Sequence, residues 1–439
     1  MSNFAFSFVM LGGMLGLMAL RIPIAVAMLA TGMTGYIIVS GWVPLISHLQ
    51  TAPFATFSTY SLSVIPLFLL MGEFATNAGM SKALFRAANT WLGHRRGGIA
   101  MAAVGGCAGF GAICGSSLAT AATMAQVALP EMKRYRYSGA LSTASLACGG
   151  TLGILIPPSV ILVVYAIMTE QSIGKLFIAA ILPACLAVAG YMATIAIVVR
   201  RNPEAGPAGP KTSVAERLQS IKDIWAVALI FILVIGGIYR GWFTPTEGAA
   251  VGTFGTGMLA FLHGNMRWEG FLHCVYGAAR STAMIFLILL GAEIFNSFLA
   301  LTRMPVEAAR MISESGFSPL VVLLLIMLLY LVLGCVMDSM SMILLTIPIF
   351  YPIISVLDFG LPPEETAIWF GIIAVIVVEV GLITPPVGMN VFIINSFAKD
   401  VPMSESFRGV FPFLLSDFTR IAILVAFPSI TLALVRLWG

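Results

Sequence analysis

Apolar segments follow one another along almost the whole chain, from residue 4 to residue 436, with short polar stretches between them. A helix needs about 20 apolar residues to cross the hydrocarbon core of a bilayer. A transmembrane β-barrel would instead show segments of about ten residues with alternating polarity. The pattern therefore predicts an all-α polytopic membrane protein. It shows no cleavable signal, because Arg21 follows the first apolar run instead of preceding it.

Two of the apolar segments contain a double proline where a helix should continue, within residues 149–159 and 379–388. A proline inside a helix removes a backbone donor and clashes with the carbonyl four residues back. The two stretches match at one constant offset (381 − 153 = 385 − 157), which pairs Gly153 with Gly381, Pro157 with Pro385, and Pro158 with Pro386. We predict two broken helices, near 153–158 and 381–386.

Basic residues flank the apolar segment Gly97–Met132, at 94–96 on one side and 133–136 on the other. Basic loops stay on the cytoplasmic side, so this segment must enter the membrane and return. That predicts a helical hairpin with its tip near 111–117, a stretch rich in glycine and serine. Non-helical backbone at membrane depth is tolerated only inside protein or beside a wet cavity.

A second apolar stretch, 320–357, is interrupted at 334–341 and flanked mainly by acidic residues. This predicts a second hairpin, which enters from the outside. A hairpin followed by a broken helix thus occurs twice, from opposite faces, which is the pattern of inverted-topology repeats in transporters. The hairpins align less cleanly than the broken helices, because the pairing of Gly115 with Asp338 has a shorter offset (338 − 115) than the pairing of the breaks.

These features divide the chain into segments. The loop 200–222 is rich in proline, glycine and basic residues, so we interpret it as a cytoplasmic linker between two halves. We expect scaffold helices in 1–93, a first transport repeat in 94–199, scaffold helices of the second half in 223–301, a second transport repeat in 302–399 and a C-terminal span in 400–439. Within them, 281–301 is predicted to cross the membrane after an amphipathic stretch at 268–280, and the last span to cover about 411–436.

Composition and motifs narrow the functional classes. The chain is 59% hydrophobic and 10% charged, and its net charge of +4 says little about partners. The six cysteines lie scattered in apolar segments without a CxxC or Cys/His cluster, so we interpret them as packing residues. The sequence contains no HExxH or GxGD motif, and no histidine lies near a predicted break. We therefore expect no enzyme, no metal other than a coupling ion, and no cofactor.

Each predicted tip and break frees backbone carbonyls and amides inside the membrane. Carbonyl oxygens with Ser, Thr and Asp oxygens suit a hard cation, and helix N-termini attract anions. The first predicted Na⁺ site comprises Gly115, Ser116, Ser117, Gly153 and Ile156. The second comprises Asp338, Ser339, Ser341, Gly381 and Thr384. Asp338 carries most of this prediction, because a carboxylate inside a membrane is costly to bury. The candidate substrate contacts are Ser116, Pro157, Pro158, Pro385 and Pro386.

Structural interpretations compete with these assignments. A lone serine in an apolar helix usually bonds back to a carbonyl of its own helix, and glycine-rich stretches often mark close helix crossings. Glu73 and Glu293 lie in or near spans, where each can bind a proton or bond to a neighbouring helix. Arg280 can face a substrate carboxylate or extend to the cytoplasmic surface.

The breaks and tips also carry a resemblance to a known family. The similar stretches are Gly111–Thr123, Pro130–Lys133, Gly149–Ser159, Phe243–Glu247, Asp338 with the apolar segment that follows it, and Gly381–Asn390. In this order and over nearly the whole chain they resemble the large, DctM-like membrane subunit of the tripartite ATP-independent periplasmic (TRAP) transporters, in the wider ion transporter superfamily. The resemblance implies an elevator-type, Na⁺-coupled importer of the bacterial inner membrane.

The same resemblance implies partners. They are a small four-helix membrane subunit, which we expect as a separate chain, a periplasmic substrate-binding protein, and a small carboxylate substrate such as a C4-dicarboxylate. Membrane lipid surrounds the protein, and no nucleic acid is expected. A stand-alone Na⁺/dicarboxylate symporter of the same superfamily stays an alternative, and an intramembrane enzyme is a more distant one.

Overall fold

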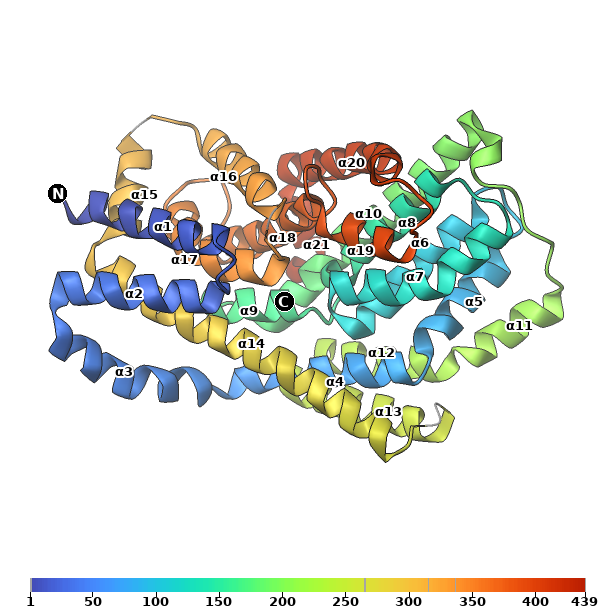
Figure 1. The fold of residues 1–439 in the computed structure, drawn as a ribbon, viewed down its shortest axis with the longest axis horizontal. Helices are drawn as coiled ribbons and strands as arrows, with labels where there is room; N and C mark the ends of the chain where they lie inside the picture. Colours follow the sequence, from blue (N-terminus) through green and yellow to red (C-terminus); the bar gives the residue numbers. More distant parts are fainter. Residues whose placement is uncertain (1, 264–265, 315, 336, 439) are drawn as a thin grey trace.

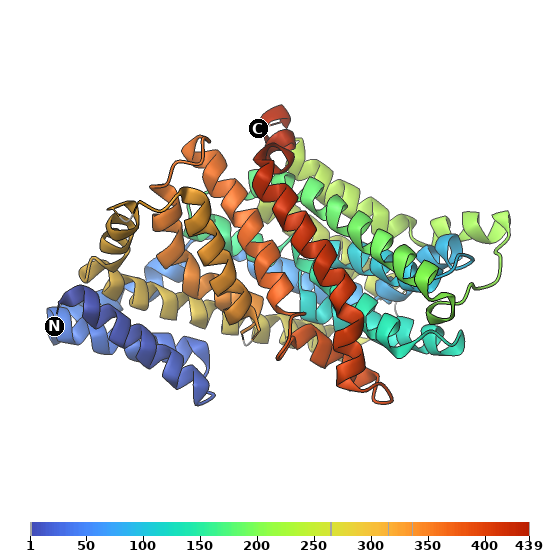
Figure 2. The same ribbon diagram turned by 90° about the horizontal axis from the view of Figure 1, so that it is seen from above.

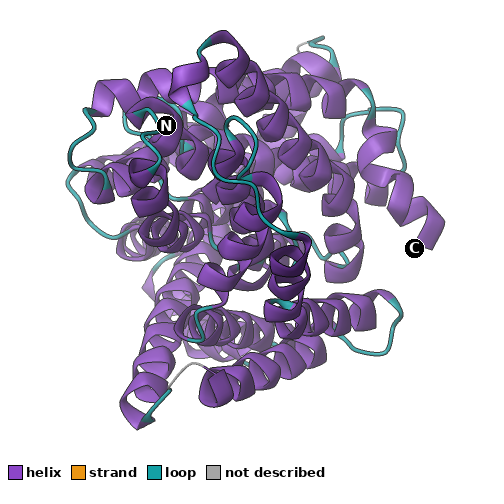
Figure 3. Ribbon diagram, turned by 90° about the vertical axis from the view of Figure 1, so that its right-hand side faces the viewer, coloured by secondary structure: helices purple, strands orange, loops and turns teal. Residues whose placement is uncertain are grey.

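The computed structural model describes residues 2–263, 266–314, 316–335 and 337–438, and every regular element among these residues is a helix (Figure 1, Figure 3). This confirms the all-α prediction. Serine residues begin many of the helices, because their hydroxyl groups accept hydrogen bonds from the first free backbone N–H groups. Ser138, for example, accepts from the Leu141 N–H at 3.3 Å where the first broken helix begins.

The helices of the predicted scaffold lie in the N-terminal part and at the start of the second half. The helices before the first repeat are α1 (Asn3–Ala19), α2 (Ile24–Ser40), α3 (Trp42–Phe57), the 3₁₀ helix η1 (Tyr60–Ser63), α4 (Val64–Asn77) and α5 (Met80–Leu92). Those after the linker are α12 (Trp225–Tyr239), α13 (Pro245–His263), α14 (Trp268–Leu301) and α15 (Met304–Glu314). Helix α14 packs against α2 and α4, and α4 also packs against α13.

The first repeat comprises a hairpin, a broken helix and a long return helix. Its elements are α6 (Gly98–Cys114), α7 (Ser117–Arg134), α8 (Gly139–Leu155), α9 (Val160–Met168) and α10 (Ile173–Arg201). The linker that follows holds η2 (Pro203–Ala205) and α11 (Val214–Asp223). The structure thus confirms a hairpin over the predicted segment and a helix break at the first double proline.

The second repeat has the same order. Its elements are α16 (Pro319–Gly334), α17 (Ser339–Ser355), α18 (Pro363–Gly381) and α19 (Met389–Phe397), followed by α20 (Met403–Ala426) and α21 (Pro428–Trp438). The second segment of each broken helix packs on the other repeat, since α9 contacts α17 and α18 while α19 contacts α7 and α8. Helix α20 crosses the middle of this assembly against α8 and α10 (Figure 2). The two repeats therefore form one interlocked unit.

Three boundaries differ from the prediction. Residues 268–301 form one continuous helix, α14, and Arg280 is an exposed residue within it. The sequence pattern does not predict helix α3, since the polar residues His48, Gln50 and Thr51 and the internal Pro53 obscure it. The last predicted span is two helices, because the chain leaves helical geometry at Phe427, directly before the proline that starts α21.

Several helices are long and apolar enough to cross a membrane. Among the described residues, α10, α14 and α20 satisfy this on their own. Three bent pairs satisfy it together, and one of them is α8 with α9, which meet at an angle of 43°. The first predicted broken helix is thus a bent span by length and composition.

The stretch FTPTE at 243–247 has a structural role. The Thr244 N–H and hydroxyl donate to Glu247 Oε2 at 2.8 and 2.9 Å, and the Glu247 N–H donates to the Thr244 hydroxyl at 3.2 Å. This reciprocal capping arrangement starts α13.

Candidate functional site

The first hairpin turns within two residues. Gly115 has a left-handed backbone with φ of +63°, a conformation that glycine adopts without steric cost. Ser116 is extended, and its hydroxyl accepts from the Ala119 N–H at 3.4 Å, so it caps α7. A side chain at Gly115 would begin 3.1 Å from the Pro158 carbonyl oxygen. The tip of the first hairpin therefore lies against the first broken helix.

The arm before this tip crosses the broken helix at a pair of glycines. A Cβ on Gly111 would lie 2.4 Å from the Cα of Gly153. The second hairpin repeats this contact, since a Cβ on Gly381 would lie 2.7 Å from the Cα of Gly334. Both crossings bring two backbones into direct contact, which only glycine permits. The glycines that the sequence pattern selected thus join each hairpin to its own broken helix.

Residues predicted for the first Na⁺ site lie close together around Gly153. A Cβ on this glycine would lie 3.0 Å from the Ser116 carbonyl oxygen and 2.5 Å from the Thr120 hydroxyl oxygen. Thr120 is fully buried, and its hydroxyl has no hydrogen-bond partner among the described residues. The sequence analysis did not select Thr120. It could have been found as a hydroxyl residue one helical turn after the tip residue Ser116. The Ile156 N–H donates to the Leu152 carbonyl at 3.0 Å, so only the Ile156 carbonyl stays available to a cation.

The second hairpin tip is capped by a carboxylate. Asp338 is half-buried, and its Oδ2 accepts from the Ser341 N–H at 3.1 Å at the start of α17. The Cys335 thiol donates to the Pro385 carbonyl at 3.4 Å, which ties this tip to the second break. The two capping residues are Ser116 and Asp338, whereas the sequence comparison pairs Asp338 with Gly115. In the structure, Asp338 of the second tip therefore corresponds to Ser116 of the first tip, one residue after the Gly115 that the sequence comparison paired with it.

The second break differs from the first in its polar contacts. The Thr384 hydroxyl donates to the Val380 carbonyl at 2.6 Å, which is the bond back to its own helix that serines and threonines commonly make. Its lone pairs stay available to a cation. Helix α19 begins after Gly388, which is left-handed with φ of +61°. Pro157 and Pro158 are buried whereas Pro385 and Pro386 are exposed, so the four prolines among the five candidate substrate contacts are not equivalent in the two repeats.

A buried glutamate joins the two hairpins. Glu379 lies on α18 and is 2% exposed, and its Oε1 accepts from the Ser339 hydroxyl at 2.5 Å. The Ser117 hydroxyl of the first tip lies beside the same carboxyl group. Oε2 has no partner with hydrogen-bond geometry among the described residues. The first residue of α7 and the first residue of α17 thus converge on one side chain, which sequence reasoning missed although it is a lone acid in an apolar run.

The other polar candidates lie on the scaffold helices α4 and α14. Glu73 packs against Gly277 within the scaffold. Glu293 is exposed and lines a cavity of about 380 Å³ between α3 and α14 on one side and α9 and α17 on the other. Arg280 is exposed on α14. Among the described residues, no group of three or more His, Cys, Asp or Glu side chains has the arrangement of a metal site.

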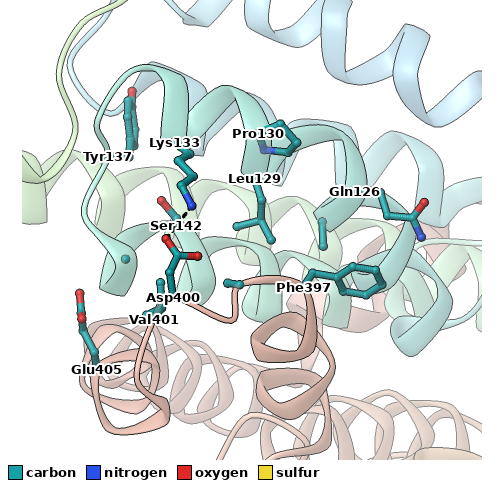
Figure 4. Close-up of a pocket in the computed structure, with 13 residues that line it drawn as sticks. Gln126, Leu129, Pro130, Lys133, Tyr137, Ser142, Phe397, Asp400, Val401 and Glu405 are labelled. Atoms are coloured by element: carbon teal, nitrogen blue, oxygen red, sulfur yellow. Dashed lines mark hydrogen bonds and ion pairs between the residues drawn. The ribbon is translucent and has the colours of Figure 1, made fainter.

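A larger cavity, of about 510 Å³, separates the first hairpin from the end of the second broken helix (Figure 4). Lys133 of α7 and Asp400, in the loop after α19, point toward one another across it and form an ion pair of 2.8 Å. The Lys133 ammonium group lowers the pKa of the Asp400 carboxyl. On the same side, Glu405 accepts from the Ala140 N–H at 3.0 Å.

Two hairpins whose tips meet two helix breaks, inside an apolar bundle, define a membrane transporter with internal repeats. The sequence matches the family described as "Tripartite ATP-independent periplasmic transporter, DctM component" over residues 11–430. The chain therefore belongs to this family of large permease subunits, which are integral membrane transporter proteins and not enzymes.

Related proteins support this membership. The chain is 38% identical to the C4-dicarboxylate TRAP transporter large permease protein DctM of Pseudomonas aeruginosa, and the match covers 87% of each protein. It is 30% identical to the sialic acid TRAP transporter large permease protein SiaM of Vibrio cholerae, over 86% of this chain and 87% of that protein. The fold is also similar to the crystal structure of the Alcanivorax borkumensis YdaH transporter, with a TM-score of 0.58, 13% identity and 88% coverage of both chains.

Proposed function

We propose that this chain is the translocating subunit of a Na⁺-coupled importer of a small organic acid in the bacterial inner membrane. The observation that carries the proposal is the pairing of each hairpin tip with a helix break. Each pair combines backbone carbonyls at helix ends with side-chain oxygens, of Ser116 and Thr120 at the first and of Asp338 and Thr384 at the second. Such oxygen sets suit a hard cation.

A carboxylate is the substrate class that this arrangement favours. Helix N-termini at the two tips and at the second segments of both broken helices point positive dipole ends toward the breaks. The relative from Pseudomonas aeruginosa is named for C4-dicarboxylates, and the one from Vibrio cholerae for sialic acid. Both substrates carry carboxylates. A C4-dicarboxylate or a related organic acid is therefore the proposed cargo.

The proposed mechanism moves the two interlocked repeats against the scaffold. Cross-packing of α9 and α19 makes the repeats one unit, and the 380 Å³ cavity lies between that unit and the scaffold helices α3 and α14. Partners of the proposed complex are a small four-helix membrane subunit and a periplasmic binding protein that delivers the substrate. No ATP is expected to be used, because the sequence has no GxxxxGK[ST] motif.

Uptake into proteoliposomes tests the coupling ion. The vesicles contain this chain and its small partner, and the binding protein with radiolabelled substrate is added outside. Replacing Na⁺ by K⁺ on both sides, at fixed pH and voltage, is expected to abolish uptake. Full uptake in K⁺ would contradict the proposal. Co-purification with a small membrane subunit separates it from the stand-alone symporter, which needs no such partner.

A further inference from the structure

A series of polar side chains crosses the apolar core between the two helix breaks. It begins at Thr151 on α8, two residues before Gly153. The Thr151 hydroxyl lies 3.2 Å from the Tyr191 hydroxyl on α10. The Tyr191 hydroxyl donates to both carboxylate oxygens of Asp417 on α20, at 3.0 and 2.9 Å. Tyr191 of α10 thus connects Thr151 of the first broken helix to Asp417 of α20.

The series continues toward the second broken helix. Arg420 donates from Nη2 to Asp417 Oδ1 at 2.7 Å, and the two side chains are 6% and 1% exposed. Nε and Nη1 of Arg420 have no hydrogen-bond partner in the part of the chain that the structure describes. Helix α18 carries Glu379 and packs against α20, and the Glu379 carboxyl group accepts from the Ser339 hydroxyl at the second hairpin tip. Unpaired donors of Arg420 and the unpaired Oε2 of Glu379 thus belong to the same buried region.

The two ends of this series are equivalent positions of the two repeats. Thr151 and Glu379 each lie two residues before the glycine of a break, and their spacing (379 − 151) equals the offset that relates the breaks (381 − 153). Helix α20 packs against both α8 and α18. Asp417 and Arg420, one turn apart on α20, therefore lie on the helix between the two breaks, and Asp417 is connected to Thr151 through Tyr191.

Stability alone does not explain this ion pair. Burying two charges in an apolar core costs more than apolar residues of the same volume would, and replacing such pairs is often neutral or stabilising. Ionisable residues inside membrane proteins are functional by default. Asp417 and Arg420 lie on α20 between Thr151 and Glu379, each of which belongs to the helical turn directly before a candidate cation site. This position indicates a role in ion binding.

We propose that Asp417 and Arg420 are a positioning pair that couples the two Na⁺ sites, so that ion binding at one break raises the affinity at the other. This inference rests on the proposed Na⁺ coupling. Ion binding that orders the turn before Gly153 fixes Thr151, and through Tyr191 it fixes Asp417 and its partner Arg420. Both lie on α20, which packs against α18, the helix that carries Glu379 and its contact with Ser339 at the second tip. Linkage requires the effect to be reciprocal.

Tyr191→Phe tests the coupling, because it removes one hydroxyl and keeps the aromatic packing against Phe413. The readout is the rise in Tm of the purified protein as NaCl replaces KCl at constant ionic strength. Wild-type protein is expected to show a cooperative Na⁺ curve. In Tyr191→Phe the Hill coefficient should fall toward one, and half-saturating Na⁺ should rise about fivefold, which corresponds to one net hydrogen bond.

Tyr165→Phe is the matched control. Its buried hydroxyl donates to the Ala367 carbonyl at 2.6 Å and lies outside the series. This variant should lower Tm and leave the Na⁺ curve unchanged. The double variant Asp417→Asn with Arg420→Gln should lose cooperativity as Tyr191→Phe does. The double change is used because removing one partner leaves an unpaired buried charge.

A folded Tyr191→Phe protein with the wild-type Na⁺ curve would overturn the inference. So would a raised half-saturating Na⁺ with unchanged cooperativity, since that is a local effect on the first break. If Na⁺ does not raise the Tm of the wild-type protein, that result contradicts the proposed function and, with it, the proposed coupling. A cooperative wild-type curve that Tyr191→Phe leaves intact contradicts the coupling alone.

Discussion

Asp338→Asn separates an ion-binding role of this residue from a structural one. Asp338 caps α17 through the Ser341 N–H at 3.1 Å, and asparagine is as good an N-cap as aspartate. The substitution therefore keeps the helix start and one acceptor oxygen while it removes the charge. Insertion, yield and Tm without Na⁺ are expected to match those of the wild type.

The loss of Na⁺ affinity follows from electrostatics. Two unit charges about 4 Å apart interact by about 4 kcal/mol at an effective dielectric constant of about 20. Asp338 is half-buried, so solvent screening reduces this to about 1–2 kcal/mol, a rise of about 5- to 30-fold in half-saturating Na⁺. The assay is the initial rate of substrate uptake into proteoliposomes against Na⁺ concentration.

A matched variant at the first tip is Ser116→Ala, which removes a hydroxyl dipole and the cap on the Ala119 N–H. It should weaken Na⁺ dependence less than Asp338→Asn, since a dipole interacts more weakly with a cation than a full charge does. A well-folded Asp338→Asn protein with wild-type half-saturating Na⁺ would refute the reasoning, and so would a folding defect with unchanged Na⁺ dependence.

Three further predictions concern topology, packing and pH. Cysteines introduced at Arg96 and Arg134 should react with an impermeant thiol reagent only from the cytoplasm; labelling of either from outside would disprove the orientation of the first hairpin. Gly381→Ala should lower stability by about 1–3 kcal/mol, because its Cβ would lie 2.7 Å from the Gly334 Cα, whereas Gly236→Ala on α12, with open space around it, should be neutral in thermal unfolding. The Lys133–Asp400 contact should persist from neutral pH down through the usual titration range of aspartate, because the pKa of Asp400 is lowered, and be lost at more acidic pH. Hydrogen exchange of residues 398–402 measures this, and in Lys133→Ala the protection that depends on this contact should already be absent at neutral pH.

Much of the two repeats was predictable from sequence because the signals for their helix breaks and hairpin tips are local. Double prolines and glycine–serine tips disrupt helices wherever they occur, so 153–158, 381–386, 111–117 and 334–341 mark interruptions without reference to neighbours. The structure has helix ends within all four stretches. The constant offset between the two breaks also selected Gly153 and Gly381, which the structure brings against Gly111 and Gly334.

The rest depended on contacts between distant segments. Thr120, Glu379 and Tyr191 look like ordinary residues of apolar helices, and their significance appears only when the chain brings Gly153, Ser339 and Asp417 beside them. Sequence alone also does not say that α9 and α19 pack on the opposite repeat. Such pairings join residues as far apart in the chain as Tyr191 and Asp417, and no local pattern records them.

The most direct test of the account is whether a Na⁺ gradient sets the direction of substrate movement. Proteoliposomes with the complete transporter are held at zero voltage and equal pH, with substrate and binding protein present outside. An inward Na⁺ gradient is predicted to drive accumulation above the outside concentration, and adding a channel-forming Na⁺ ionophore should dissipate that accumulation. Accumulation that is unaffected by collapsing the Na⁺ gradient would contradict the account.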